Sequence, residues 1–191
     1  MENTARRLYL LDILRGLASI SVVVWHYQHF YFTGASGLSS DFSRSSQPFY
    51  DYFSLLYNEG SRAVYLFFTL SGFIFFYHYS DAVHARMVGA KEFALLRVSR
   101  LWPLHIATLT FVCALQVASF HLDGEFIVYS CNNWKRFLIN ALLISDWLPS
   151  AFRCTPFNGP VWTLSDEIFL YIVFFVFALV VPRRRQLVAI V

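Results

Sequence analysis

Long apolar runs separated by short polar stretches dominate the chain. A helix needs roughly 17–25 residues to cross about 30 Å of hydrocarbon, and four runs are long enough. These runs are Leu14–Phe32, Ala63–Ser80, Leu101–Phe120 and Val161–Val181. A fifth run, Phe137–Leu148, is short and carries Asp146, which favours a re-entrant or interfacial helix, or a short span buried among others. The pattern predicts an all-α fold, a polytopic bundle of transmembrane helices with about five apolar segments.

The composition supports this fold class and excludes others. Of the 191 residues, 57% are hydrophobic and 14% are charged, whereas a typical soluble domain is about 25% charged. The mean hydropathy is +0.50. The basic residues are scattered over short loops, which argues against nucleic-acid binding. The three cysteines form no CxxC motif, so we expect no metal site.

The distribution of basic residues predicts the orientation in the membrane. With the N-terminus in the cytoplasm, ten of the 15 Lys and Arg residues fall on the inner side, as the positive-inside rule requires. This orientation also requires that Phe137–Leu148 does not cross completely. If that segment did cross, the basic run Arg183–Arg185 would lie outside, against the rule.

Both ends of the chain carry topological information. Arg6 and Arg7 before an apolar run resemble a secretory signal, but ionisable residues within the run favour a retained first span. After Arg183–Arg185, the apolar stretch 186–191 predicts the start of a further span, so we expect a longer protein. In the first long loop, the aromatic stretch 49–53 predicts a short interfacial helix.

The first span contains ionisable residues on one face. Arg15 and His26 are eleven positions apart, which is about three helical turns and roughly 16 Å along the axis. Asp12 and Ser19 fall on the same stripe. An ionisable residue inside a bilayer costs on the order of 2.5–3.5 kcal/mol, so His26 requires a partner or a wet cavity. The alternative is a structural histidine that is hydrogen-bonded between helices.

The last span and the inner loop supply candidate partners. Glu167 would lie roughly 10 Å below the outer surface, at a depth similar to His26, which predicts that the two are paired. A purely structural ion pair is the alternative. Arg97 and Arg100, three residues apart at the cytoplasmic edge, suit phosphate groups, although basic residues there also serve topology alone.

Other polar residues of the apolar segments receive structural interpretations. Ser71 and Gly72 are expected to let another helix approach closely, and no nucleophile elbow surrounds Ser71. We assign no role to the four histidines near segment ends, where hydration is available: His78, His84, His105 and His121.

Four short motifs, in order along the chain, resemble those of the acyltransferase 3 family of membrane O-acyltransferases. They are Leu11-Asp12-x-Leu-Arg15-Gly16-Leu17-Ala18 with His26; Phe67-Phe68-x-Leu70-Ser71-Gly72-Phe73; Arg97-x-x-Arg100; and Asn158-Gly159-Pro160-x-Trp162-x-Leu164-Ser165-x-Glu167-x-Phe169-x-Tyr171. Two positions depart from the family pattern: Ile13 stands where Gly is common, and Thr163 where Ser is usual.

The resemblance implies an activity and roles for these residues. Such proteins have about ten spans, so residues 1–191 would form a single transmembrane acyltransferase domain truncated at its C-terminus. An acyl group, usually acetyl, would pass from cytoplasmic acyl-CoA to a hydroxyl of an extracytoplasmic or lipid-linked glycan. Arg97 and Arg100 would hold the donor, with Arg15 at the inner end of the path. His26 would act as the general base and Glu167 would fix its tautomer. A transient acyl-His is an alternative order of events.

The resemblance also implies a multi-pass protein of the cytoplasmic (inner) membrane, with no resident cofactor or metal. The acyl group, the acceptor and the oligomeric state stay open. A transporter of a small anion or acylated metabolite, or a structural membrane subunit, would be the alternative class.

The topology makes a separate prediction about the cysteines. Cys131 and Cys154 both fall in the outer region, where disulfides persist, and are expected to form a bridge, whereas Cys113 lies within a span. The alternative is two unpaired thiols.

Overall fold

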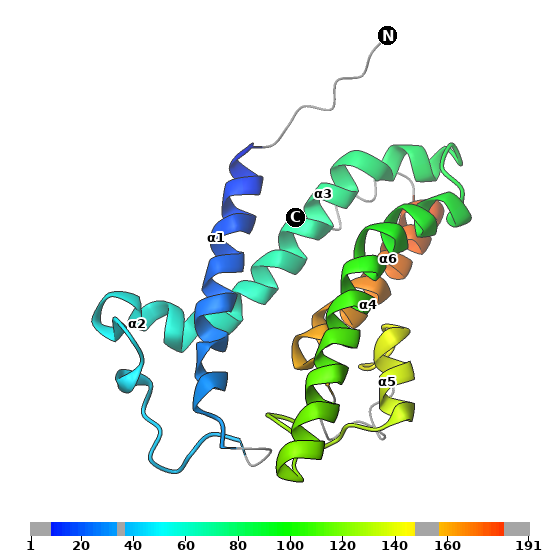
Figure 1. The fold of residues 1–191 in the computed structure, drawn as a ribbon. Coiled ribbons are helices and arrows are strands. Elements are labelled where there is room, and N and C mark those ends of the chain that lie inside the picture. Colours follow the sequence, from blue (N-terminus) through cyan, green and yellow to red (C-terminus); the bar gives the residue numbers. More distant parts are fainter. Residues whose placement is uncertain (1–8, 34–36, 148–156, 182–191) are drawn as a thin grey trace. The chain divides into compact units, whose positions relative to one another are not determined.

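The computed structural model describes residues 9–33, 37–147 and 157–181. Helices make up almost all of its regular structure (Figure 1). In chain order they are α1 (Tyr9–His26), η1 (Tyr27–Tyr31), η3 (Arg44–Ser46), α2 (Tyr50–Glu59), η4 (Gly60–Arg62), α3 (Ala63–His84), α4 (Ala90–Asp123), α5 (Trp134–Ala141), η6 (Gly159–Val161) and α6 (Trp162–Val180). In the described ranges the strand-like pairing is an isolated bridge between Phe32 and Leu38. The all-α prediction is confirmed.

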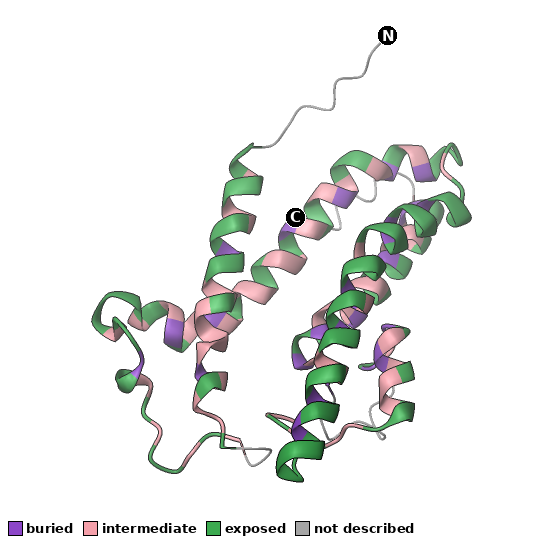
Figure 2. Ribbon diagram, in the orientation of Figure 1, coloured by how far each residue is buried: buried purple, intermediate pink, exposed green. Residues whose placement is uncertain are grey.

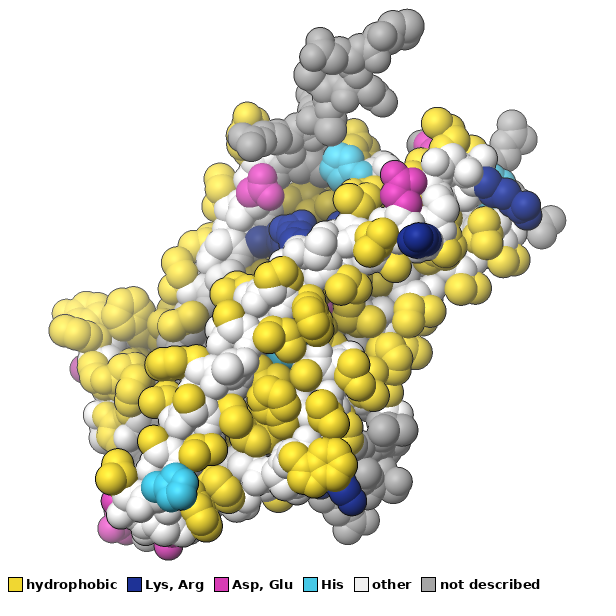
Figure 3. All heavy atoms as spheres, turned by 45° about the vertical axis from the view of Figure 1, so that its right-hand side comes forward, with side chains coloured by type: hydrophobic (Ala, Val, Ile, Leu, Met, Phe, Trp, Pro, Cys, Tyr) yellow, Lys and Arg dark blue, Asp and Glu magenta, His cyan; other side chains and the backbone are white. Residues whose placement is uncertain are grey.

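Four helical stretches of the described chain are long and apolar enough to cross a membrane. They are Tyr9–Tyr31, Tyr50–His84, Ala90–Asp123 and Gly159–Val180. Each of them contains most of one predicted span. Many of their large apolar side chains are exposed, as a lipid environment requires. Figure 2 shows the exposed residues of each helix, and Figure 3 shows hydrophobic side chains over much of one face.

The helix bounds differ from the predicted ones at several places, and three of these differences are the largest. The helix α4 begins eleven residues before Leu101 and runs through Pro103, so the two arginines expected at the end of a loop lie within it. A proline removes one backbone hydrogen bond, and long spanning helices tolerate this loss. The first α-helix ends at His26 and continues as a 3₁₀ turn. The short segment forms a helix only up to Ala141, capped by the Asn133 side chain, which accepts from the Arg136 N–H at 3.0 Å.

The chain divides into two compact units, which are described separately. Unit 1 comprises Met1–Tyr27, Ser43–Ala90 and Leu170–Val191, and unit 2 comprises Gln28–Phe42 and Lys91–Phe169. Unit 1 therefore holds α1, α2, α3 and the C-terminal part of α6. Unit 2 holds most of α4, together with α5 and the start of α6.

In unit 1, a glycine allows α1 to approach the turn before α3. A Cβ atom on Gly60 would lie 2.8 Å from the Trp25 Cβ and even closer to the Ser21 carbonyl oxygen. By contrast, a Cβ on Gly72, where the sequence suggested close helix packing, meets no described atom within 4 Å. The close approach thus occurs at Gly60 and not at Gly72 among the described residues.

A short helix is present where the aromatic stretch predicted one, as α2, and its interfacial location stays a prediction. Its Tyr57 is buried at the centre of a small cluster. The Tyr57 hydroxyl donates to the Pro48 carbonyl at 3.0 Å, and its ring stacks on Tyr50. The Arg44 guanidinium donates to the Tyr57 carbonyl. These contacts fold the preceding loop back onto α2.

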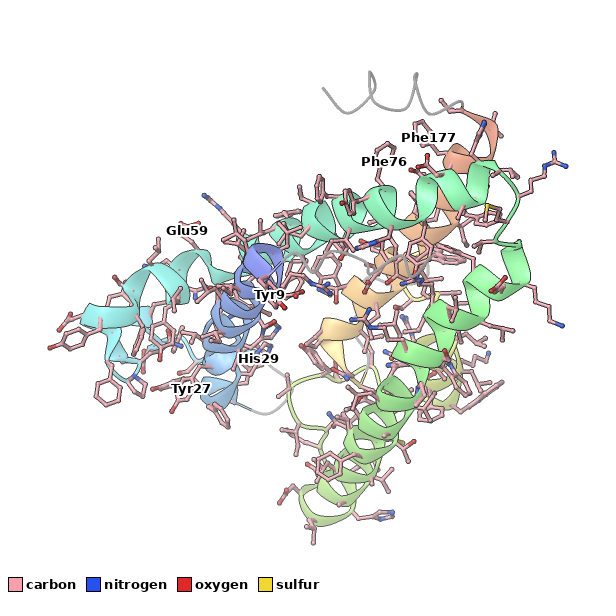
Figure 4. All side chains as sticks on the ribbon, turned by 90° about the horizontal axis from the view of Figure 1, so that it is seen from above. Tyr9, Tyr27, His29, Glu59, Phe76 and Phe177 are labelled. Atoms are coloured by element: carbon pink, nitrogen blue, oxygen red, sulfur yellow. The ribbon has the colours of Figure 1, made fainter. Side chains whose placement is uncertain are left out.

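Unit 1 also contains the contacts by which α3 packs on the C-terminal half of α6. The Phe75 ring meets the Tyr171 ring edge-on, with centroids 4.7 Å apart. Near the end of α3, the His84 Nδ1–H donates to the Ala178 carbonyl at 3.3 Å. Figure 4 labels Phe76 and Phe177 at this same end of the two helices.

In unit 2, polar side chains of α4 bind the backbone of the segments that follow it. The Gln116 amide pairs with both backbone groups of Ile127, donating at 2.7 Å and accepting at 2.9 Å. The Ser119 hydroxyl donates to the Glu125 carbonyl at 2.8 Å. Trp102 donates through its indole N–H to the Ala141 carbonyl at 2.9 Å, which fastens α5 to α4.

We predict that Gly60→Ala destabilises the protein by about 1–3 kcal/mol, the usual penalty for overpacking, because the contacting atoms belong to the α1 backbone and a Cβ. The measurement is thermal unfolding of the purified full-length protein in detergent. Gly16→Ala, in α1 with open space around its Cβ, is the control and should be neutral or slightly stabilising. Equal stability of Gly60→Ala and wild type would contradict the packing.

Candidate functional site

The first candidate residues lie on one continuous helix. Arg15 and His26 are both half-buried in α1, and their separation of eleven residues places them on one face. Ser19, on the same stripe, donates its hydroxyl to the Arg15 carbonyl at 2.9 Å. The predicted shared face of Arg15, Ser19 and His26 is therefore present.

The hydrogen bond of His26 defines which ring nitrogen is basic. Its Nδ1 lies 2.8 Å from the Val22 carbonyl oxygen, which accepts hydrogen bonds and cannot donate them. Nδ1 therefore carries the proton, and in the neutral ring the lone pair is on Nε2. The Trp25 ring packs edge-on against the imidazole at 4.8 Å. The family resemblance implies that Glu167 fixes this tautomer, and the Val22 carbonyl of the same helix turn is a partner that favours it.

Glu167 is half-buried in the N-terminal part of α6, which belongs to unit 2, whereas His26 belongs to unit 1. Their pairing stays a prediction. The neighbouring Ser165 is fully buried and holds the segment after α5: its hydroxyl accepts from the Asp146 N–H at 3.2 Å, and its carbonyl accepts from the Trp147 indole at 3.0 Å. Within the motif around Glu167, Ser165 therefore has a structural role.

Arg97 and Arg100 lie one turn apart on α4 but differ in environment. Arg97 is only 8% exposed, and its guanidinium lies 5.3 Å from the centre of the Phe93 ring. Arg100 is exposed. The two are neighbours on the helix, as predicted, and only Arg97 is drawn into the interior of its unit.

The interpretation of His105 as a hydrated residue near a segment end is wrong. This side chain is 2% exposed within α4, because the helix begins earlier than the sequence suggested. Its Nε2–H donates to the Asn140 carbonyl at 2.8 Å. Its Nδ1 and the Asn140 side-chain oxygen are buried with no hydrogen-bond partner among the described groups.

A second polar group that the sequence did not reveal surrounds Tyr129. The Tyr129 hydroxyl lies 3.3 Å from the His29 Nε2 and in contact with Gly159. Burial raises the pKa of the Tyr129 phenol, which therefore stays protonated at neutral pH. Nothing local in the sequence joins residues 29, 129 and 159, and only the final motif marks Gly159.

Among the described residues, no three His, Cys, Asp or Glu side chains lie together in a group that could hold a metal ion. Of the cysteines, Cys131 is disulfide-bonded and Cys113 is a free thiol. Cys154 lies outside the described residues, so the Cys131–Cys154 pairing stays a prediction.

Thr163, which stands where the related family usually has Ser, donates its hydroxyl to the Pro160 carbonyl at 2.8 Å.

Four long apolar helices with ionisable residues on their faces define a multi-pass membrane protein. The family model of the acyltransferase domain, acyltransferase 3, matches residues 8–191. The chain belongs to the acyltransferase 3 family.

Two curated proteins are similar to the chain. The acyltransferase MdmB of Streptomyces mycarofaciens is 31% identical over 117 residues, which are 60% of this chain and 27% of MdmB. Protein 2 in the picA locus of Rhizobium radiobacter is 26% identical over 179 residues, 87% of this chain and 80% of that protein. The match thus spans about a quarter of MdmB. No solved structure gives a significant match.

We predict that the bridge of Cys131 joins it to Cys154. Of the three cysteines in residues 1–191, alkylation of the denatured protein should label only Cys113 before reduction and all three after it. Peptide mapping should recover the 131–154 linked pair. Labelling of all three thiols before reduction, or a linked pair that includes Cys113, would contradict the prediction.

Proposed function

We propose that the full-length protein is an O-acyltransferase of the cytoplasmic membrane, which moves an acyl group, usually acetyl, from cytoplasmic acyl-CoA to a hydroxyl of an extracytoplasmic or lipid-linked carbohydrate. Membership of the acyltransferase 3 family favours this class over a transporter of a small anion. The observation that carries the proposal is the hydrogen bond of His26 to Val22, which leaves Nε2 as the basic atom of an intramembrane imidazole.

The chemistry assigned to His26 is general-base catalysis. Nε2 takes the proton of the acceptor hydroxyl while that oxygen attacks the thioester carbonyl carbon. The new C–O bond forms, the C–S bond breaks, and the imidazolium returns its proton to the leaving thiolate of CoA. Throughout this cycle Nδ1 keeps its proton and its bond to the Val22 carbonyl, so the ring stays oriented. A route through an acyl-His, formed at the same Nε2, uses the same tautomer.

Two further residues would act on charges in this step. Glu167 would stabilise the imidazolium, because a half-buried carboxylate on a spanning helix is a suitable counter-ion. Arg15, three turns from His26 on the same face of α1, would attract the anionic donor towards that helix.

The donor site is assigned to the arginines of α4. A guanidinium forks two hydrogen bonds onto phosphate oxygens, and acyl-CoA carries several phosphates. Arg97 supports this assignment more strongly than Arg100, since a buried arginine in a spanning helix requires a functional or structural reason. Arg100, exposed one turn further along, would provide a second contact at the periphery.

We predict that His26→Ala lowers acyl transfer by about 10²–10⁴-fold, the usual effect of removing a general base. His26→Asn should be equally impaired, because its amide still donates to Val22 but lacks a basic nitrogen. The measurement is transfer of labelled acetyl from acetyl-CoA to the surface polysaccharide of the host strain, in membranes with matched protein levels. His121→Ala, at an exposed position late in α4, is the control and should be active. Transfer near the wild-type rate in His26→Asn would exclude the assigned role.

We predict that Arg97→Lys with Arg100→Lys raises the KM for acetyl-CoA by about tenfold or more, because lysine keeps the charge but loses the forked geometry. Orientation should be unchanged, since the positive charges remain. The readouts are the donor KM and the accessibility of engineered cysteines on both membrane faces. The control is Lys91→Arg, at an exposed position of the same helix. Full donor affinity in the double variant would show that the pair serves topology and that the donor binds elsewhere.

A further inference from the structure

A cluster in unit 2 holds one phenol hydroxyl in a defined position, and the catalytic proposal does not use it. Its members come from three segments far apart in the chain: His29 in η1, Tyr129 in the loop after α4, and Gly159 in η6. All three belong to the same compact unit. Figure 4 labels His29 on the 3₁₀ turn.

The backbone at Tyr129 is fixed from both sides. Its carbonyl accepts from the Asn132 side-chain amide at 2.7 Å, and the oxygen of that amide accepts from the Phe157 N–H at 2.6 Å. One asparagine thus ties the loop to the residue that precedes the Asn158-Gly159-Pro160 motif. The Gln116 amide holds the other side of the loop at Ile127, two residues before Tyr129.

Gly159 provides the space that the phenol occupies. A Cβ at this position would lie 2.6 Å from the Tyr129 Cζ and closer still to its hydroxyl oxygen. The atoms met belong to a ring whose backbone is held on both sides, so the ring has little freedom to withdraw. A glycine is therefore required at 159 for the hydroxyl to stay where it is.

The hydroxyl has hydrogen-bonding capacity beyond its contact with His29. A protonated phenol has one donor and two acceptor positions, and the imidazole nitrogen uses one of these. The surroundings are aromatic: the His29 ring meets the Tyr129 ring edge-on at 6.2 Å, and Phe32 lies 4.7 Å from His29. Tyr129 and His29 are both half-exposed, so a ligand could reach them.

A positioned hydroxyl among aromatic rings matches a sugar, which presents hydroxyl groups beside apolar C–H faces. A phosphate or a CoA group would instead call for cations. The described groups that contact the Tyr129 hydroxyl are the His29 imidazole and Gly159, and neither is a Lys or Arg. The chemistry of this cluster therefore favours the neutral acceptor over the anionic donor.

We infer that Tyr129, positioned by His29 and Gly159, binds a hydroxyl of the carbohydrate acceptor and helps to determine which acceptor is used. This inference rests on the proposed acyl transfer for its reaction and on the geometry of unit 2 for its site. Gly159 is in this account a positioning residue, which acts through Tyr129.

The test uses the full-length protein in membranes, acetyl-CoA as the donor and the purified surface polysaccharide of the host strain as the acceptor. Tyr129→Phe removes one oxygen atom and keeps the ring that packs against Gly159 and His29. The KM for the polysaccharide should rise about tenfold, the effect of one lost hydrogen bond, while the KM for acetyl-CoA stays the same. Gly159→Ala should raise the polysaccharide KM at least as much. Tyr52→Phe, on the exposed face of α2, is the control and should match wild type.

The outcomes separate a binding role from a structural role. A purely structural role would lower thermal stability and the amount of active protein while leaving both KM values unchanged, and that result overturns the inference. An equal rise of both KM values also overturns it, because it shows no selectivity for the acceptor.

A failure of the proposed function gives a different result. If wild type transfers no acetyl to the polysaccharide, binding is measured instead, as the rise in unfolding temperature that the polysaccharide alone causes. Stabilisation of wild type that Tyr129→Phe loses supports the binding site without the reaction. Equal stabilisation of both proteins, or none, overturns the inference.

Discussion

The pairing of polar side chains with backbone carbonyls is the constraint on which this structure depends. In an apolar environment an unpaired polar group costs several kcal/mol, so each one buried in a spanning helix needs a partner. Here the partner is repeatedly a main-chain oxygen: Asn140 for the buried His105, Val22 for the half-buried His26 and Ala178 for the exposed His84. These carbonyl partners lie on a neighbouring turn or segment and introduce no further charge.

This mode of pairing has a chemical consequence for the imidazoles. A carbonyl accepts and never donates, so each of these three rings must carry its proton on the nitrogen that faces the carbonyl. His26 and His84 donate through Nδ1, whereas His105 donates through Nε2. In the neutral ring His26 therefore carries its lone pair on Nε2, the ring atom farther from its own backbone, which is the geometry that a base acting on a bound hydroxyl requires. The fold selects a tautomer before any carboxylate is considered.

Sequence reasoning found what depends on composition and periodicity. The four long spans, the presence of a short helix near Phe137–Leu148 (observed at Trp134–Ala141) and the shared face of Arg15 and His26 follow from the lengths of apolar runs and from helical spacing. It could not find what depends on contacts between distant segments. Gly60 against Trp25, and Gly159 against Tyr129, look like ordinary turn glycines in the sequence. The sequence suggests a helix start at Leu101, which would place His105 near a hydrated end, whereas α4 begins at Ala90 and His105 is buried within it.

The two arginines of α4 have two possible roles in the sequence, a topology signal and a binding site for the donor. Their difference in burial helps to distinguish these roles. A topology signal needs only positive charge on the cytoplasmic side, and an exposed arginine supplies it fully. Arg100 is exposed, so its environment fits either explanation. Arg97 is 8% exposed, and its desolvation adds nothing to orientation. The Phe93 ring at 5.3 Å offsets part of the desolvation, since cation–π contacts contribute about 0.5–2 kcal/mol. The burial of Arg97 therefore has a cost that orientation alone does not explain.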